Sequence, residues 1–380
     1  MKDLLEIRQE IDKIDDQICK LFVDRMNLSK DVAMYKMAKN NVVTDSKRED
    51  DIVYRLSESV PDEYKYYLKE LYSTIFSVSK TNQIRLMQSP SKTTEKINKA
   101  LDSENKKFPI SATVACQGVE GANSGIATKK VFPICNISYF KNFEGVFTAV
   151  DKGFCEFGVL PIENSTAGSV LDVYDLMNKY NTYIVKSVRV KINHCLVANI
   201  GVEKKDIKKV ISHSQALSQC ANYINALKVE SESVENTAVA GKRIAESGDM
   251  TTACICSKEC AELYNLKILE ENIEDNPHNY TRFIVISKKL EIYEDSDRIS
   301  VMLSAPHESG SLSKILSKFS ALNLSLTKLE SRPIVGGDFE FIFYFDFIGS
   351  VKNQGVINLI SELENKSQRF EFLGCYKEII

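Results

Sequence analysis

The sequence predicts a multidomain protein in which an all-α bundle, an α/β domain and a ferredoxin-like sandwich follow one another. Apolar residues recur every seven positions from Asp3 to Asn40 with no Pro or Gly between them, which is typical of one long helix. From Ile110 short apolar runs alternate with helical periodicity, which indicates an α/β domain with open sheets. After Arg298 the expected order of elements is βαββαβ. A chain of 380 residues is long enough for two or three such domains.

Composition narrows the possible functions. The 49 Lys and Arg against 52 Asp and Glu give a net charge of −3, so no global basic field argues for nucleic acid or an anionic membrane. The N-terminus is not that of a signal peptide, and no apolar run approaches the roughly 18 residues of a membrane span. The ten Cys are scattered through expected strands and helices, which favours a reducing cytoplasm. Cys254, Cys256 and Cys260 come closest to a cluster, but no CxxC pair or nearby His accompanies them, and we expect no metal and no cofactor.

The long N-terminal helix carries an apolar seam made of two interleaved heptad series. These series are Leu4, Ile11, Ile18, Val32 and Ile7, Ile14, Leu21, Leu28, Tyr35. At 1.5 Å per residue the helix would be about 55 Å long, so it needs partner helices in a bundle or a dimer. Arg25 occupies an apolar position of this seam. Because an unpaired guanidinium there costs several kcal/mol, we expect an anion to meet it.

Two further cations of the same helix bear on this anion site. Lys36 follows Arg25 on nearly the same face, about 16 Å along the axis, so the two long side chains could hold one small anion. Arg8 is about 25 Å from Arg25. It could serve such a site only from another copy of the helix, and otherwise it is a solvated charge.

The next two helices add polar residues around the same region. Ser46 and Glu49 have capping-box spacing for a helix that runs to Leu56, with Asp45 and Arg48 at its start. A third helix begins after Pro61 and Asp62. Its apolar stripe, Leu68, Leu71, Tyr72 and Ile75, continues into Ser79 and Gln83. These two polar positions need either a polar ligand or the solvent of a frayed helix end.

Eight of these residues resemble, in type and spacing, the active site of the all-helical chorismate mutases. They are Arg8, Arg25, Lys36, Asp45, Arg48, Glu49, Ser79 and Gln83. In that family three helices from each of two chains interlace, and the partner chain supplies one arginine of each site. The residue of this sequence that matches that arginine is Arg8. The resemblance implies that the arginines bind the two carboxylates of chorismate. It also implies that Lys36 and Gln83 bind the ether oxygen of chorismate and that Glu49 binds its hydroxyl. Asp45 and Ser79 would complete the pocket. The rearrangement to prephenate is pericyclic and needs only positioning and charge stabilisation.

The α/β region has its own pattern of expected elements. The strands are Ala112–Cys116, Phe157–Leu160, Tyr183–Val190, Cys195–Ala198, Lys209–Ser212, Ala253–Ser257 and Arg282–Ser287, and the helices include Ile126–Phe132, Phe143–Lys152 and Gln215–Leu227. The loop Gly118–Gly125 follows the first strand, but its glycines are spaced GxxGxxxG, which argues against a dinucleotide. A small carboxylate at the following helix start fits better.

Three clusters stand at strand ends: Pro161–Thr166, Ser212–Gln215 and Asn279–Phe283. Each alone could be ordinary capping chemistry. Together, with Asn193–Leu196 and Gln219-Cys220, they resemble prephenate dehydratase over Ile110–Lys288. That family has two α/β lobes around a cleft, like periplasmic binding proteins, and converts prephenate to phenylpyruvate with loss of carbon dioxide and hydroxide.

This resemblance assigns roles to residues of the three clusters. Thr281 would be a positioned hydrogen-bond donor or relay for the departing hydroxyl. Arg282 and Phe283 belong to the same substrate-binding motif. Ser124, Asn164 and Ser165 would anchor the dianion, and His213 either tunes the site or is a satisfied structural histidine.

The last module resembles an ACT domain, the amino-acid sensor that follows prephenate dehydratases. Its expected elements are Ile299–Ser304, Ser311–Ala321, Leu324–Leu329, Phe339–Phe347, Gln354–Leu363 and Arg369–Tyr376. Glu330-Ser331-Arg332-Pro333 matches the family's effector motif, and Gly310-Ser311-Leu312-Ser313 keeps the Gly and Leu of the second motif. The resemblance implies phenylalanine bound between paired ACT domains, with Gly310, Leu312, Glu330 and Ser331 in contact with it.

The three modules in this order resemble the bifunctional P-proteins of phenylalanine synthesis. We expect domains at residues 1–88, 109–289 and 298–380, with a linker at 89–108, and a homodimer or higher homo-oligomer. One alternative is a dehydratase alone, in which the helical domain only dimerises. Another is a phenylalanine-binding regulator without activity, although no helix-turn-helix or basic patch supports it.

Overall fold

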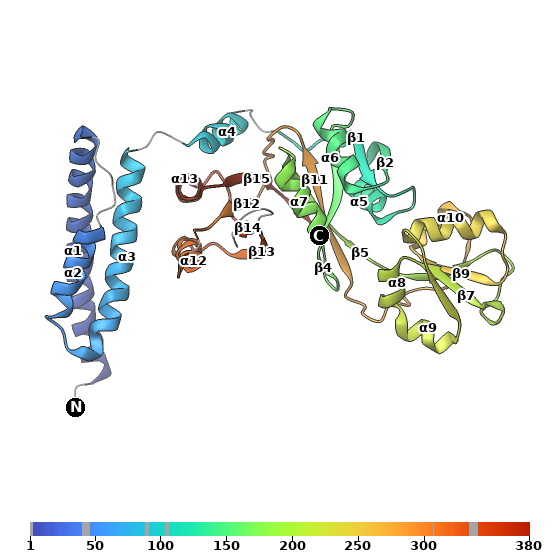
Figure 1. The fold of residues 1–380 in the computed structure, drawn as a ribbon, viewed down its shortest axis with the longest axis horizontal. Coiled ribbons are helices and arrows are strands. Elements are labelled where there is room, and N and C mark those ends of the chain that lie inside the picture. Colours follow the sequence, from blue (N-terminus) through green and yellow to red (C-terminus); the bar gives the residue numbers. More distant parts are fainter. Residues whose placement is uncertain (1–2, 40–45, 88–90, 103–105, 307, 334–340) are drawn as a thin grey trace. The chain divides into compact units, whose positions relative to one another are not determined.

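A computed structural model describes residues 3–39, 46–87, 91–102, 106–306, 308–333 and 341–380. These residues group into two compact units, one of which contains the N-terminal helices. Figure 1 shows the order of the elements along the chain. Within the described ranges, no helix is long and apolar enough to cross a membrane.

The N-terminal unit is helical, as predicted. Helix α1 (Leu4–Lys39) is one unbroken helix, and α3 (Asp62–Met87) packs beside both α1 and α2 (Ser46–Ser57) (Figure 1). Ala33 and Phe76 are buried in this unit. The apolar side chains of the α1 heptad seam remain exposed, however. Ile18 is 57% exposed and Leu21 is 67% exposed. The described helices of this unit therefore leave a long apolar face of α1 uncovered.

The segment predicted as a linker contains a helix. α4 spans Lys92–Leu101, and its Ile97 is fully buried. Residues 88–90 and 103–105 of the same segment lie outside the described residues.

The first α/β lobe is built on a seven-stranded sheet. Its order is β16-β5-β11-β3-β1-β2, with the short β4 paired to β3. The strands are β1 (Ser111–Gln117), β2 (Ile134–Phe140), β3 (Phe157–Asn164), β4 (Gly168–Ser169), β5 (Tyr183–Lys191), β11 (Tyr280–Ser287) and β16 (Glu378–Ile379), and the helices are α5 (Asn123–Val131), α6 (Phe143–Asp151) and α7 (Leu171–Lys179). Strands β1 and β3 are parallel, and β11 runs antiparallel between β3 and β5. The carboxyl end of β3 thus lies beside the beginning of β11, where Asn164 pairs with Thr281.

The second lobe is inserted between β5 and β11. Its five-stranded sheet has the order β10-β6-β9-β7-β8. The strands are β6 (Cys195–Ala198), β7 (Lys209–Ser212), β8 (Glu230–Ser233), β9 (Thr252–Cys256) and β10 (Lys267–Glu270), and the helices are η1 (Lys204–Asp206), α8 (Ser214–Gln219), α9 (Ala221–Leu227), α10 (Thr237–Ser247) and α11 (Lys258–Leu263). The chain therefore passes between the lobes twice, which confirms the predicted two-lobed fold.

The C-terminal module has the predicted βαββαβ order. Its elements are β12 (Arg298–Ser304), α12 (Ser311–Ala321), β13 (Leu326–Pro333), β14 (Phe341–Ile348), α13 (Gln354–Lys366) and β15 (Phe370–Tyr376). The antiparallel sheet has the order β13-β14-β12-β15. Strand β16 then returns to pair with β5 of the first lobe.

The C-terminal sheet and the first lobe share one hydrophobic core. The cluster includes Leu160, Tyr174 and Ile284 of the lobe together with Met302, Tyr344 and Tyr376 of the module. At Gly374, with φ +152°, an added Cβ would clash with the carbonyl oxygen of Ile184, so β15 and β5 approach as closely as their backbones allow. The module is thus packed firmly against the dehydratase-type sheet.

Several element predictions were wrong in detail. The expected helix Gln215–Leu227 is two helices, because the Gln219 carbonyl accepts from the Asp275 amide and the chain bends at Cys220 (φ −118°, ψ 22°). Strands β2, β4, β8, β10 and β16 were not predicted. The sequence of β8, Glu-Ser-Glu-Ser, has no apolar residue, and only its pairing with β7 makes it a strand.

Candidate active sites

In the helical unit α1 and α3 bring together residues separated by more than fifty positions. Arg25 Nη1 donates to Ser79 Oγ over 2.5 Å, and its guanidinium lies 5.5 Å from the ring centre of Phe76. Ser79 is buried. Within the described residues Arg25 forms no ion pair, so its charge is met by a neutral hydroxyl and an aromatic face. This arrangement leaves the guanidinium available to an anion.

Gln83 lies one turn further along α3 and is 9% exposed. Its Nε2 donates to Ser29 Oγ over 2.8 Å, whereas its Oε1 is buried without a hydrogen-bond partner among the described residues. A buried amide oxygen left unpaired costs free energy, which favours a polar ligand at this place. On α2, Glu49 Oε2 lies 2.9 Å from Lys80 Nζ. Sequence reasoning missed Ser29 and Lys80, although each is a helical neighbour of a predicted residue.

The other predicted residues of this site are placed less closely. Lys36 is half-buried on α1, and Arg48 is exposed on α2. Arg8 is exposed on α1, and because α1 is continuous it lies about 25 Å from Arg25. Asp45 lies outside the described residues.

A cavity of about 380 Å³ opens at the strand ends of the two-lobed unit. Of the predicted residues, Ser124, Asn164, His213, Thr281 and Phe283 line it. Among the described residues that line it there is no Lys or Arg. Any anion held there must therefore be stabilised by dipoles and neutral donors.

Helix N-termini supply those dipoles. The cavity lining includes Ala122, Val170 and Asn236, which are the N-cap residues of α5, α7 and α10. These helices have 9, 9 and 11 residues, and their unpaired backbone N–H groups carry partial positive charge. Neither Ala122 nor Val170 caps its helix with a side chain. The N–H groups of Gly125 and Val173 bond the carbonyls of Ala122 and Val170, so among the described residues the first two N–H groups of each helix are left for a ligand. That a small carboxylate binds at the start of α5 stays a prediction.

Asn164 is the centre of the hydrogen bonding on the cavity floor. Its Nδ2 donates to Asn279 Oδ1 (2.8 Å) and to Thr281 Oγ1 (3.0 Å), and its Oδ1 accepts from the backbone N–H groups of Thr166 and Ala167. Because Asn164 donates to Thr281, the threonine hydroxyl is left to donate its own hydrogen. No acceptor for that hydrogen is present among the described residues. Thr281 is 9% exposed and lines the cavity, so the hydrogen is available to a bound ligand.

A second row of hydrogen bonds supports Asn279. Gln219 Oε1 accepts from Asn279 Nδ2 (3.1 Å) and lies 2.9 Å from His194 Nε2. His194 is 4% exposed, and burial lowers its pKa below the ordinary value of 6.5, against the opposing hydrogen bond to Gln219. A neutral His194 that donates to Gln219 fits this environment. Sequence reasoning quoted His194, Gln219 and Asn279 but gave them no role in the site.

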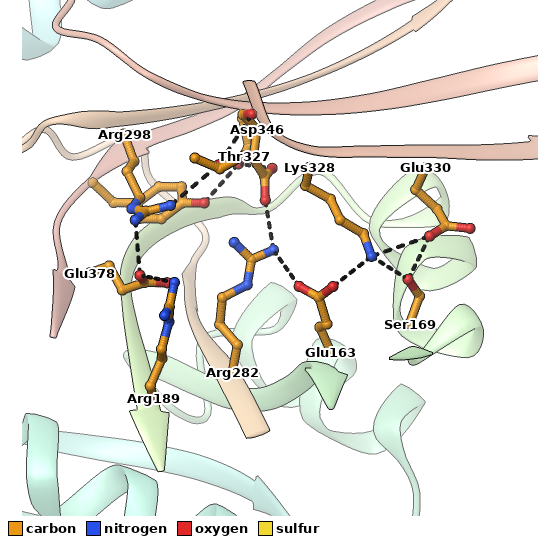
Figure 2. A network of polar contacts seen from close by, with 12 residues as sticks. Glu163, Ser169, Arg189, Arg282, Arg298, Thr327, Lys328, Glu330, Asp346 and Glu378 are labelled. Atoms are coloured by element: carbon orange, nitrogen blue, oxygen red, sulfur yellow. Dashed lines mark hydrogen bonds and ion pairs between the residues drawn. The ribbon is translucent and has the colours of Figure 1, made fainter. Parts of the chain in front are cut away.

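Two predicted dehydratase residues do not line the cavity. Ser165 binds the neighbouring loop, since its Oγ donates to the His278 carbonyl and accepts from the Tyr280 amide. Arg282 faces away from the cavity and pairs with Asp346 of the C-terminal module over 2.6 Å (Figure 2). At the cavity edge, His213 Nδ1 accepts from the Gln215 amide and so caps α8.

Thiol chemistry has no support in this cavity. No cysteine is among the described residues that line it. All ten cysteines are free, and burial raises the pKa of Cys116 and Cys220, which lie outside the cavity lining, to about 12. Within the described part of the chain, no group of three or more His, Cys, Asp or Glu side chains could hold a metal ion.

The predicted effector residues lie on two elements of the C-terminal module. Gly310 is the N-cap of α12, with φ +79°, and Leu312 lies in the first turn. Glu330 and Ser331 are neighbours on β13, so their side chains point to opposite faces of the sheet. Glu330 Oε2 lies 2.5 Å from Ser169 Oγ, and Ser169 lines the cavity of the first lobe.

These arrangements define a chain with two separate places suited to small anions, one in a helical bundle and one between two α/β lobes. Residues 7–84 match the family model of type II chorismate mutase, and residues 114–291 match that of prephenate dehydratase. The chain belongs to the prephenate dehydratase family and carries a chorismate mutase module ahead of that domain.

Similar proteins agree with this assignment. An arogenate dehydratase/prephenate dehydratase of Arabidopsis thaliana is 36% identical over 292 residues, which cover 72% of this chain and 73% of that one. A bifunctional chorismate mutase/prephenate dehydratase of Enterobacter agglomerans is 28% identical over 98% of this chain and 95% of its own. The crystal structure of a prephenate dehydratase from Arthrobacter aurescens in complex with L-Phe superposes with a TM-score of 0.64 at 28% identity, over 70% of this chain and 89% of that chain.

Proposed function

We propose that the chain is a bifunctional enzyme of phenylalanine synthesis. The helical module rearranges chorismate to prephenate, and the two-lobed domain converts prephenate to phenylpyruvate. The first step is an isomerase reaction and the second a carbon–oxygen lyase reaction. The observation that carries the second activity is the Asn164–Thr281 hydrogen bond at the floor of a cavity lined by helix N-termini.

In the mutase site, catalysis rests on electrostatic stabilisation by charged and polar side chains. Arg25, held by Ser79 and Phe76, binds a carboxylate of chorismate, and Arg48 assists it. Lys36 and the second hydrogen of the Gln83 Nε2 amide group stabilise the negative charge that develops on the ether oxygen as the bond breaks. Glu49 accepts from the substrate hydroxyl, and Asp45 completes the pocket. No proton transfer or covalent intermediate is required.

The mutase site is completed by a second copy of the chain. Arg8 is too far from Arg25 to act within one chain, and the seam of α1 exposes a long row of apolar side chains. A homodimer, alone or within a larger homo-oligomer, covers this seam and brings the partner's Arg8 to the site.

In the dehydratase cavity the ring carboxylate leaves as carbon dioxide, and its bonding electrons complete the aromatic ring while the ring hydroxyl departs. Thr281 Oγ1 donates a hydrogen bond to the departing oxygen, which leaves as hydroxide, and Asn164 holds the threonine hydroxyl in place. The N-termini of α5, α7 and α10 hold the negative charge of the substrate, with Ser124 as a further polar contact. His213 orients the start of α8.

The C-terminal module is proposed to be an ACT domain that binds phenylalanine and lowers dehydratase activity. Support comes from its βαββαβ order, from Gly310 at the start of α12, and from Glu330-Ser331 on the edge strand β13. An edge strand can pair with a second copy, which suits an effector bound between paired modules.

One assay tests both activities. Purified protein is given chorismate, and prephenate and then phenylpyruvate are measured by separation of the products. A dehydratase with a non-catalytic helical domain would leave chorismate unchanged and still consume added prephenate. A phenylalanine-binding regulator would consume neither compound, and it would bind phenylalanine in a calorimetric titration.

A further inference from the structure

Strand β13 of the C-terminal module faces the first lobe with charged side chains. Lys328 Nζ lies 2.8 Å from Glu163 Oε1 and 2.6 Å from Ser169 Oγ, and Glu330 Oε2 lies 2.5 Å from the same hydroxyl (Figure 2). The side chain of Lys328 is only 14% exposed, so its charge depends on these partners. Lys328 is thus tied to a residue at the end of β3 and to one that lines the cavity.

A second contact joins the same strand end to β14. Arg282 Nη2 donates to Asp346 Oδ2 over 2.6 Å and lies 3.6 Å from Glu163 Oε2 (Figure 2). Asp346 also accepts from Ser300 Oγ over 2.6 Å. Arg282 and Asp346 are each 8% exposed. A buried guanidinium without its carboxylate is strongly unfavourable, so this pair fixes where β11 lies against the C-terminal sheet.

The partners of these charges are direct chain neighbours of the proposed catalytic pair. Glu163 precedes Asn164 on β3, Arg282 follows Thr281 on β11, and the two strands pair Glu163 with Arg282 and Asn164 with Thr281. Successive side chains of a strand point to opposite faces. Asn164 and Thr281 therefore face the cavity, while Glu163 and Arg282 face the C-terminal module.

We propose that Lys328 and Asp346 of the C-terminal module are positioning residues for the dehydratase reaction. By holding Glu163 and Arg282 they fix the ends of β3 and β11. This keeps Asn164 within hydrogen-bond distance of Thr281 and aims the threonine hydroxyl at the substrate. The C-terminal module is then a structural part of the dehydratase site.

The same contacts supply a route for the effector, and this step rests on the proposed function. Glu330 of the effector motif lies 3.4 Å from Lys328 and is bonded to Ser169. An amino-acid effector that recruits the Glu330 carboxylate to its ammonium group withdraws it from both partners. Lys328 and Ser169 then rearrange, and with them the end of β3 and the cavity wall.

The test compares Lys328→Gln, which removes the charge, with Lys328→Arg, which keeps it. We expect Lys328→Gln to lower dehydratase kcat about tenfold or more with a smaller change in KM, because a slight displacement of aligned groups is costly. Lys328→Arg should recover most of the loss. Mutase turnover by the same preparations serves as the internal standard and should stay unchanged.

Asp175→Asn is the matched control. Arg332 Nη2 and Asp175 Oδ2 lie 2.7 Å apart and form an ion pair between the same two modules, but Asp175 belongs to α7 and is not a neighbour of Asn164 or Thr281. We expect this variant to keep the wild-type dehydratase kcat. Equal dehydratase rates in Lys328→Gln and Asp175→Asn would overturn the proposal.

Ser300→Ala is a milder second variant that loosens Asp346 without leaving a buried charge unpaired. Ser300 Oγ also lies 2.8 Å from the buried Tyr376 hydroxyl, so some loss of stability accompanies the change. We expect a fall in dehydratase kcat of about two- to fivefold at a temperature where the variant is folded, with mutase turnover unchanged. A wild-type rate in Ser300→Ala and in a folded Lys328→Gln would refute the positioning role. By contrast, wild-type protein that leaves prephenate unconsumed would refute the proposed function itself.

Discussion

The side-chain amide of Asn164 donates to the hydroxyl of Thr281 over 3.0 Å, across the pairing of β3 with β11. Asn164 is itself fixed by four further contacts, to Asn279, to the Tyr280 carbonyl and to two backbone amides. The threonine hydroxyl accepts this bond and keeps its own hydrogen for a ligand in the cavity that Thr281 lines.

Replacement of Thr281 by Ala removes this donor. We expect dehydratase kcat to fall about a hundredfold or more, the range for one positioned donor to a developing negative charge, while mutase turnover persists. Thr281→Ser should keep much of the activity, because the hydroxyl and its bond to Asn164 survive. Phenylpyruvate formation from added prephenate measures both effects. Equal activity in Thr281→Ala and wild type would rule out the donor role, and parallel loss of both activities would indicate misfolding.

Lys36 is the proposed donor to the ether oxygen in the mutase site. Lys36→Ala should abolish mutase turnover, because the charge that develops on the ether oxygen loses its ammonium partner, and leave dehydratase activity intact. Lys30→Ala, at an exposed position of the same helix, is the control and should behave as wild type. The disappearance of chorismate measures the result. Undiminished turnover in Lys36→Ala would contradict the assignment.

Arg8 is predicted to act in the site of the partner chain. Arg8→Ala and Lys36→Ala should each be inactive as mutases, but subunits mixed after reversible dissociation should regain activity. Random exchange places both wild-type residues in about one quarter of all sites, so about a quarter of the wild-type rate is expected. If the mixture stays inactive while mixed dimers are demonstrated by mass spectrometry, the shared site is wrong.

The helical module and the strand ends were predictable because their signals are local. A heptad seam predicts a partner helix, and Arg25 at one of its apolar positions predicts an anion. In the structure Arg25 donates to Ser79. Thr281 and Asn164 stand at strand ends, where ligand groups gather. The side of the sheet on which the Arg282 side chain lies was not predictable from such local signals. It depends on the pairing of β11 with β3 and on Asp346, 64 positions further along the chain.

The hydrogen bonds below the cavity were also not predictable from the sequence. His194, Gln219 and Asn279 lie on three separate segments, and their relation exists only because the chain crosses twice between the lobes. The sequence also does not mark Lys328, since a single lysine on an edge strand resembles any solvated charge. Its partners, Glu163 and Ser169, belong to another domain.

His194 links the stability of the two-lobed domain to pH. Burial lowers the pKa of His194 in the folded state below the ordinary 6.5. Below about pH 6.5, His194 is therefore protonated in the unfolded chain while it is still neutral in the folded chain. The unfolding free energy contributed by this residue is therefore fully present above pH 6.5 and falls as the pH drops further. The slope is at most about 1.4 kcal/mol per pH unit.

Replacing His194 by Asn, which retains a donor but does not titrate in this range, should flatten the stability profile between about pH 6.5 and 5. Urea unfolding followed by circular dichroism measures the effect, since the chain has no Trp. His278→Asn, the same replacement at an exposed position, is the matched control. An identical pH dependence in wild type and His194→Asn would show that His194 does not stay neutral in the fold, and Gln219 would then have to accept from a charged ring.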